Sequence, residues 1–166
     1  MISIDLTLPQ SAIFSPDGRY RYAIVRIWTI NKPILLFIGI NPSKAGAIVN
    51  DPTITRLMAR AARNGFGGLL GSNLYALVST DPKALLTTPD AIGLETDAYL
   101  LQMVFIVKST NGKVLCGWGS FAPVKQRATD VLSMVPEPYC LGVNSDGEPK
   151  HPLYVGYDAP IIPLVR

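Results

Sequence analysis

The sequence carries little charge for its length. Aspartate, glutamate, lysine and arginine make up 16% of the 166 residues, whereas apolar residues make up 48%. Disordered segments show the opposite balance, so the composition predicts a folded chain with a sizeable core. The net charge of +3 permits an anionic partner but does not require one, because dedicated nucleic-acid-binding proteins usually carry a clustered basic face.

Histidine and cysteine are also scarce. His151 is the one histidine of the sequence, and no pair of cysteines has the spacing of a zinc site. We therefore predict neither a metal nor a cofactor. Cys116 and Cys140 fall in apolar, strand-like segments. This favours two buried, reduced thiols over a disulfide.

Long hydrophobic runs are missing as well. The longest, around residues 34–40, is too short to cross a bilayer. The N-terminal residues lack the basic start and apolar stretch of a signal peptide. We therefore expect a cytoplasmic protein with no membrane partner. The oligomeric state stays open.

What the sequence does contain is an alternation of strand and helix signals. The turn "SPDG" at residues 15–18 predicts a β-hairpin, whose second strand covers residues 19–28. Five residues should share one face of that strand: Tyr20, Tyr22, Ile24, Arg26 and Trp28. Further strands are predicted at residues 34–39, 69–78, 114–117 and 139–142.

Helices are predicted between these strands. The first starts with Asp51 as its cap and Pro52 at its first position, and Gly65 is a plausible stop. The others cover about residues 96–108, with Leu100, Leu101, Val104 and Phe105 buried, and about 123–133. The alternation predicts an α/β fold, a three-layer α/β/α sandwich with a mainly parallel sheet of about four strands. We treat residues 1–166 as a single domain, in which residues 1–32 form an N-terminal β-hairpin extension and residues 33–166 the core.

Each of the four predicted parallel strands leads to a polar or aromatic residue. Asn41 follows the first strand, Asn73 lies within the second, Trp118 follows the third, and His151 comes after the fourth. Taken singly, these residues have ordinary structural explanations as turn former, backbone partner, packing aromatic and structural histidine. Because ligands bind outside the carboxyl ends of strands in open parallel sheets, we predict that the four share one ligand site.

Five segments of the chain resemble an uncharacterised bacterial and phage family, a domain of unknown function. The resemblance covers about residues 19–154. It rests on "INPSKAG", "NDPTITR", "GFGGLLGSNLYALVSTDP", "CGWG" and "CLGVNSDGEPKHPLY".

The order of the motifs is also similar to that of the uracil-DNA glycosylase superfamily. Its mismatch-specific branch has a first motif "GINPG", matched here by Gly39 to Pro42. The resemblance implies a uracil-DNA-glycosylase-like fold and hydrolysis of an N-glycosidic bond of a nucleobase. It also implies that Asn41 positions the attacking water, that Asn73 reads the edge of the base, and that His151 stabilises the departing base.

These residue types suit that chemistry. The departing base carries negative charge, and a neutral histidine in a dry site can stabilise it by donating a hydrogen bond. The amide of Asn73 offers a donor and an acceptor to a base edge, and Trp118 can stack on a base. Asn41 can orient water but cannot take its proton, so the reaction should be slow.

The start of the helix at Pro52 is a candidate phosphate site. Lys44, Arg56 or Lys150 would add positive charge there. The predicted binding residues beside Asn73 and Trp118 are therefore Ser43, Lys44, Asp51, Arg56 and Lys150.

The sequence also departs from the glycosylase pattern. The aromatic residue expected just after the first motif is missing, and little chain follows His151 to form a loop that inserts into duplex DNA. Base flipping needs such a loop to hold the stack open. We therefore expect single-stranded nucleic acid rather than duplex, or a free nucleoside or nucleotide, as partner.

Two other functions stay open. The chain can be a non-catalytic module that binds a nucleotide or a modified base in the same site. It can also be a serine hydrolase that uses Ser43 and His151, although the G-x-S-x-G elbow of such enzymes is absent from the sequence.

Overall fold

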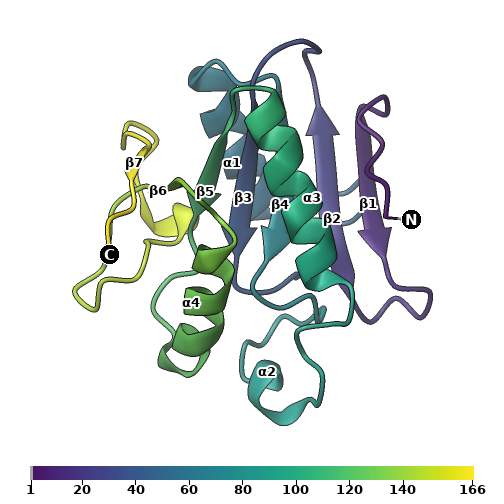
Figure 1. Ribbon diagram of the computed structural model, residues 1–166, viewed down its shortest axis with the longest axis vertical. Helices are drawn as coiled ribbons and strands as arrows, with labels where there is room; N and C mark the ends of the chain where they lie inside the picture. The colour runs from purple at the N-terminus through teal and green to yellow at the C-terminus, as the bar shows by residue number, and fades with distance from the viewer. Residues whose placement is uncertain (1) are drawn as a thin grey trace.

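The computed structural model describes residues 2–166. Within this range the chain forms a mixed sheet of seven strands in the order β1-β2-β4-β3-β5-β6-β7. The strands are β1 (Gln10–Phe14), β2 (Arg21–Ile27), β3 (Ile34–Gly39), β4 (Gly68–Asn73), β5 (Lys113–Cys116), β6 (Pro138–Cys140) and β7 (Ile162–Pro163). Figure 1 shows β1 at one edge of the sheet and β7 at the other, with the chain ends beside them.

The predicted count of about four strands is wrong, although the four strands that were counted do form the parallel part. β4, β3, β5 and β6 pair in parallel, whereas β1, β2 and β7 pair antiparallel. The difference arises because the hairpin is not an appendage. β2 pairs with β4, with Ile24 opposite Gly71, so the hairpin continues the sheet and covers an edge that would otherwise be unpaired.

Four α-helices lie within the described residues, on both faces of the sheet. They are α1 (Pro52–Arg63), α2 (Ala84–Thr87), α3 (Thr96–Ser109) and α4 (Lys125–Ser133), and short 3₁₀ turns occur at η1 (Ala122–Val124) and η2 (Pro152–Tyr154). In Figure 1, α3 and α4 lie in front of the sheet and α1 lies behind it. Buried side chains of α1 share one apolar cluster with the sheet, and those of α3 and α4 share the other.

The start of α1 forms as predicted. The Asp51 carboxylate accepts a hydrogen bond of 2.9 Å from the backbone N–H of Ile54, and Pro52 is the first helical residue. The helix ends at Arg63, and Gly65 then takes a positive φ of 83°, which a glycine adopts without strain.

The hairpin strand does not keep one face, contrary to prediction. The pairing of β1 with β2 shifts between Ile13, which faces Ala23, and Phe14, which faces Arg21. This bulge leaves Tyr22 without an opposite residue, and a bulge reverses the alternation of side chains. As a result Tyr22 stacks on Tyr99 of α3, with ring centroids 5.1 Å apart, while Ile24 joins the cluster beneath α1.

Two buried positions on α3 were predicted wrongly. Leu101 is 50% exposed and Phe105 is 72% exposed. The helix is apolar almost all round, so its hydrophobic spacing does not single out one face. Leu100 and Val104 enter the core as predicted, together with Met103 and Val107.

Strand β4 ends at Asn73, earlier than the predicted 69–78. Past this point the backbone N–H of Leu74 donates to the Gly39 carbonyl and that of Tyr75 donates to Ile40. The chain therefore turns across the end of β3 and ceases to extend the sheet. Among residues 2–166, no helix combines the length and the apolar character needed to cross a membrane. Cys116 and Cys140 are both buried and free, as predicted.

Candidate functional site

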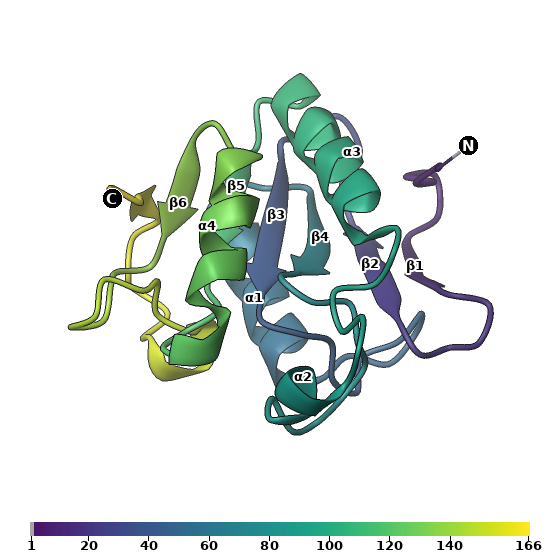
Figure 2. The same ribbon diagram turned by 60° about the horizontal axis from the view of Figure 1, so that its bottom comes forward.

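A cavity of about 910 Å³ lies at the carboxyl ends of β3, β4 and β5. Asn41, Asn73, Trp118 and His151 all line it, although they come from four separate parts of the chain. Figure 2 turns this edge of the sheet toward the viewer, with α2 beside it. Three more of the predicted binding residues line the same cavity, namely Ser43, Asp51 and Lys150.

A tight reversal of the chain after β6 brings His151 to this edge. The turn at Asn144–Gly147 folds the segment back on itself, and Val143 bridges to Pro149. The backbone N–H of Gly119, which follows β5, then donates to the Pro149 carbonyl at 2.9 Å. His151 is thereby placed directly over Gly119, where an added Cβ would lie 3.6 Å from the His151 Cβ.

The tautomer of His151 is set by its neighbour in the chain. Its Nδ1 accepts a hydrogen bond of 3.2 Å from the backbone N–H of Leu153. His151 is thereby the N-terminal cap of η2. In the neutral ring the proton therefore sits on Nε2. Burial lowers the pKa of His151, while the charge of Asp51 opposes that shift. Near pH 7 the ring is neutral, and its Nε2–H is a donor with no acceptor within residues 2–166.

The amide nitrogen of Asn41 holds the local backbone, whereas its amide oxygen is left for a ligand. Its amide nitrogen donates to the Ser79 carbonyl at 2.8 Å and lies within reach of the Pro42 carbonyl at 3.1 Å. Because these partners are acceptors, they fix the orientation of the amide. The Oδ1 oxygen makes no hydrogen bond to any residue that the structure describes. It is an acceptor in the wall of the cavity.

Asn73 is the last residue of β4 and is only 7% exposed. Its side-chain amide makes no hydrogen bond within residues 2–166, and its polar atoms are not among the fully buried ones, so they are open to the cavity. The amide packs over Gly39, where an added Cβ would lie 2.9 Å from its Oδ1. An unpaired amide at the base of a cavity is suited to bind a ligand that offers both a donor and an acceptor.

The ring of Phe37 lies beside this amide, and Phe37 was not predicted as a site residue. Phe37 of β3 lines the cavity, and its ring lies across the ends of two strands. Added Cβ atoms would come within 3.0 Å of the ring at Gly39 and 2.8 Å at Gly117. Both glycines therefore leave room for the ring. The only sequence signal was the presence of a glycine at each of two strand ends.

Trp118 is less available than predicted. It is 3% exposed, and its indole N–H donates to the Glu148 carboxylate at 2.7 Å. Arg166 also donates to that carboxylate, at 2.5 Å. Trp118 thus forms part of the cavity wall through packing, whereas Tyr154 at the rim is exposed and free to stack.

Two predicted binding residues do not line the cavity. Lys44 is exposed and lies outside it. Arg56 instead supports the segment behind His151, because its guanidinium donates to the carbonyls of Pro152 at 3.1 Å and Val155 at 2.7 Å. It also lies over the ring of Tyr157, 4.2 Å from the centroid.

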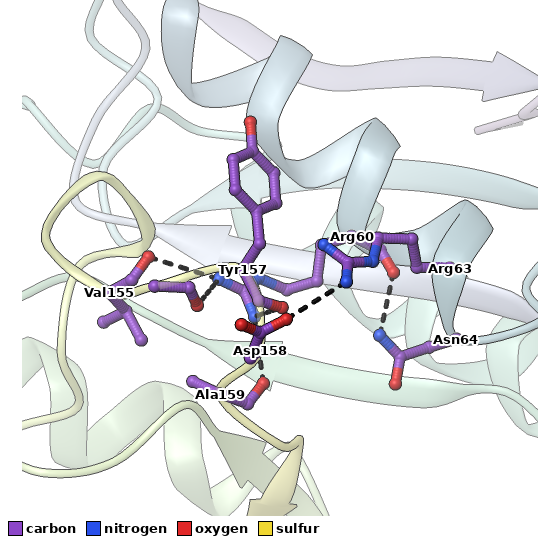
Figure 3. Close-up of polar contacts among 8 residues, drawn as sticks. Arg60, Arg63, Asn64, Val155, Tyr157, Asp158 and Ala159 are labelled. Carbon is purple, nitrogen blue, oxygen red and sulfur yellow. Dashed lines mark hydrogen bonds and ion pairs between the residues drawn. The ribbon is translucent and has the colours of Figure 1, made fainter.

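Arg60, one turn further along α1, continues this support. Its two terminal nitrogens donate to the carbonyls of the loop after η2, as Figure 3 shows for Val155 and Ala159. The shortest of these bonds is 2.8 Å, to Gly156. Arg63 pairs with Asp158 at 3.1 Å on the surface beside it. The basic residues of α1 thus hold the segment that carries His151 and do not contact the cavity.

Comparison with known families gives one match. A family model described as "Protein of unknown function (DUF1643)" matches residues 21–153. The chain belongs to this family. No curated protein and no solved structure matches it. The predicted membership of a family of unknown function is confirmed, while the similarity to uracil-DNA glycosylases stays a prediction.

This DUF1643 protein has a buried arginine in the cavity wall that was not predicted from the sequence. Arg21, the first residue of β2, lines the cavity and is 5% exposed. Because β2 runs antiparallel to β4, its first residue lies at the edge where β4 ends. The signal was an arginine inside an apolar strand, in a hairpin that was predicted to stand apart from the core.

The cavity has no arrangement of metal ligands. Across residues 2–166, no three histidine, cysteine, aspartate or glutamate side chains lie close enough together to hold a metal ion. The polar groups of the cavity wall are amides, a histidine, hydroxyls and a few charged side chains. Such groups hold a ligand by hydrogen bonds and charge.

Proposed function

We propose that the cavity binds a nucleobase compound and that the protein hydrolyses its N-glycosidic bond. With this we propose that the fold is a three-layer α/β/α sandwich of the uracil-DNA glycosylase kind. The observation that supports the proposal most is the unpaired amide of Asn73, buried in the same cavity as the Nε2–H of His151. Base edges present adjacent donors and acceptors, which an amide can match.

The proposed reaction uses four side chains. The amide of Asn73 holds the base, and the ring of Phe37 lies beneath it. The bond between C1′ and the base nitrogen breaks with both electrons going to the base, whose developing charge the Nε2–H of His151 stabilises. A water held by the Oδ1 of Asn41 forms the new bond to C1′, and its proton passes to solvent.

A non-catalytic binding module is the second candidate, and one observation favours it. Both carboxylates of the cavity wall already serve as turn caps. Asp51 and Asp81 line the cavity, and one oxygen of each accepts a hydrogen bond from a backbone N–H of its own turn. A site with the residues for recognition, whose carboxylates are used as caps, can bind without turnover.

The serine hydrolase is not favoured. In such enzymes the histidine donates Nδ1–H to a carboxylate while its Nε2 takes the proton of the serine. Here the Nδ1 of His151 accepts a hydrogen bond from a backbone N–H. Ser43 and His151 form no hydrogen bond with each other in the structure described for residues 2–166.

Single-turnover base release tests the proposal. The substrates are single-stranded and duplex oligonucleotides that carry uracil or modified bases, together with free nucleosides and nucleotides. We expect release from at least one single-stranded or free substrate, and a loss of about a hundredfold or more in His151→Ala. Thr129→Ala, which removes an exposed hydroxyl of α4 outside the cavity, is the control and should retain activity.

The Asn variants separate the two candidate functions. Asn73→Ala should weaken binding, and Asn41→Ala should lower the rate more than the affinity. Binding without release from any substrate would favour the binding module. Failure of the wild-type protein to bind or cleave any member of the panel would refute both.

A further inference from the structure

Arg21 is a buried cation without a counterion. Its side chain makes one hydrogen bond, from Nη1 to the Ala45 carbonyl at 2.6 Å, and its Nε is buried with no partner. Among residues 2–166, no carboxylate lies within 4.0 Å of the guanidinium. Burial lowers the pKa of Arg21 to about 10, with Asp51 opposing the shift and Arg26 adding to it. The group is still charged at pH 7.

The other buried arginines of this region use both terminal nitrogens on the protein. Arg26 donates to the Asn50 side chain at 2.8 Å and to the carbonyls of Ser11, Val25 and Gly46. Arg60 uses both terminal nitrogens on loop carbonyls, although its Nε is also buried without a partner, and it does not line the cavity. Arg21 therefore differs from its neighbours, because its Nη2 is left unused and it faces the cavity.

The unused nitrogens lie on one edge of the guanidinium. Nε–H and one Nη2–H form a fork that binds the oxygens of a phosphate or carboxylate. The protein covers Nε of Arg21, so Nη2 is the donor that a ligand in the cavity reaches first. Anchoring Nη1 to Ala45 fixes the plane of the group. A fixed fork loses less conformational entropy when it binds an anion.

A helix start opens into the same cavity. Asp51, Thr53 and Ile54 at the beginning of α1 are part of its wall, and α1 has twelve residues. The N-terminal end of a helix carries partial positive charge. At this start Pro52 has no N–H, and the N–H groups of Ile54 and Thr55 donate to Asp51, so the N–H of Thr53 is the one left for a ligand. Lys83 and Lys150 add positive charge in the cavity wall.

We propose that Arg21 and the start of α1 form a phosphate subsite, so that the ligand of this cavity is a nucleoside phosphate. The nucleoside half of this statement rests on the proposed function, whereas the phosphate half does not. The subsite also replaces the earlier expectation that Lys44 and Arg56 bind phosphate, since neither lines the cavity. The phosphate can be that of a free nucleotide or of a single-stranded nucleic acid.

Binding titrations test this with four kinds of probe. They are inorganic phosphate, nucleosides, the matching nucleoside 5′-monophosphates, and short single-stranded oligonucleotides. For the wild-type protein we expect a monophosphate to bind about tenfold to a hundredfold more tightly than its nucleoside, the range of one charge-assisted hydrogen-bonding group. Tighter binding of the oligonucleotide would make its phosphodiester the source of the phosphate.

Three variants locate the effect. Arg21→Met should remove the preference for monophosphate over nucleoside and leave nucleoside binding unchanged. Arg21→Lys, which keeps the charge but lacks the fork, should retain only part of it. Arg19→Met is the matched control, because Arg19 is an exposed residue of the same hairpin and carries the same charge. It should behave as wild type.

The outcomes separate this proposal from the proposed function. Phosphate binding that depends on Arg21, without any nucleoside binding, would support the subsite and refute the nucleobase site. Nucleoside binding with no gain from a phosphate would do the reverse. If Arg21→Met does not fold, or if its phosphate preference equals that of wild type, Arg21 is a structural residue and the subsite is refuted.

Discussion

Replacing two buried arginines by methionine should have unequal consequences for stability. Arg60 and Arg21 are both almost fully buried, and neither has a carboxylate partner among residues 2–166. The two differ in their hydrogen bonds. Arg60 donates to four loop carbonyls, of which Ala159 at 3.0 Å and Gly156 at 2.8 Å are well within hydrogen-bond range. Arg21 has one bond, to Ala45.

The magnitudes follow from these bonds. Arg60→Met removes at least two hydrogen bonds from a charged donor, at about 1.5–3 kcal/mol each, and relief of the buried charge recovers part of this. We expect a net loss of about 2–4 kcal/mol in the free energy of unfolding. For a chain of this size that lowers the melting temperature by roughly 4–16 °C. Arg21→Met gives up one bond and removes a desolvated charge, so its stability should stay within about 1 kcal/mol of wild type.

Urea denaturation followed by circular dichroism measures both differences at pH 7. Methionine suits this comparison because it keeps the length of the side chain and forms helices well. Equal losses in the two variants would refute the reasoning, since they would show that the number of carbonyl partners does not decide the effect. A loss below about 1 kcal/mol in Arg60→Met would refute it also.

Three further predictions concern the cavity and the core. Gly39→Ala places a Cβ 2.9 Å from the Asn73 Oδ1 and 3.0 Å from the Phe37 ring. It should lower the free energy of unfolding by about 1–3 kcal/mol and abolish ligand binding. Normal ligand binding by this variant would contradict the prediction. Burial lowers the pKa of His151 below that of the unfolded chain, so the unfolded chain binds more protons and stability falls as pH drops below 6.5. Between pH 6.5 and 5.5 the stability of His151→Asn should depend less on pH than that of wild type, and an unchanged slope would exclude His151 as the cause. Thiol reagents should modify the folded protein slowly, because burial raises the pKa of Cys116 to about 12 and Cys140 is buried too; fast labelling of the native protein would disprove this.

The sequence predicted the parallel strands and the placement of the cavity residues for one physical reason. Continuous apolar runs such as residues 34–39 mark strands buried on both faces, and the chain direction then puts Asn41, Asn73 and the "GWG" segment at one edge. His151 was harder to place because it lies well beyond β6. It reaches the cavity through the reversal at Asn144–Gly147, which sequence alone marks only as a turn.

The residues that were assigned wrongly depend on contacts between distant segments. Nothing local to α1 shows that Arg56 and Arg60 turn toward the loop at residues 155–159. Arg21 was missed because the hairpin was read as a separate extension, and pairing of β2 with β4 is a long-range event. Phe37 has the pattern of an ordinary core residue, and only the glycines at neighbouring strand ends bring the cavity to its ring.

The placement of charge around α1 links the stability of the fold to the chemistry of the cavity. Arg26 and Arg60 are buried and have no carboxylate partner among residues 2–166. Their hydrogen bonds go to neutral oxygen atoms, so both side chains keep their charge and add positive potential on this side of the sheet. Arg21 adds a third such charge, this one facing the cavity. Burial disfavours a second proton on His151, while the charge of Asp51 favours it. An anion bound at Arg21 would add a second negative charge to this cavity and raise the pKa of His151. The pH at which His151 becomes protonated should therefore shift upward when inorganic phosphate is added, and this shift should vanish in Arg21→Met.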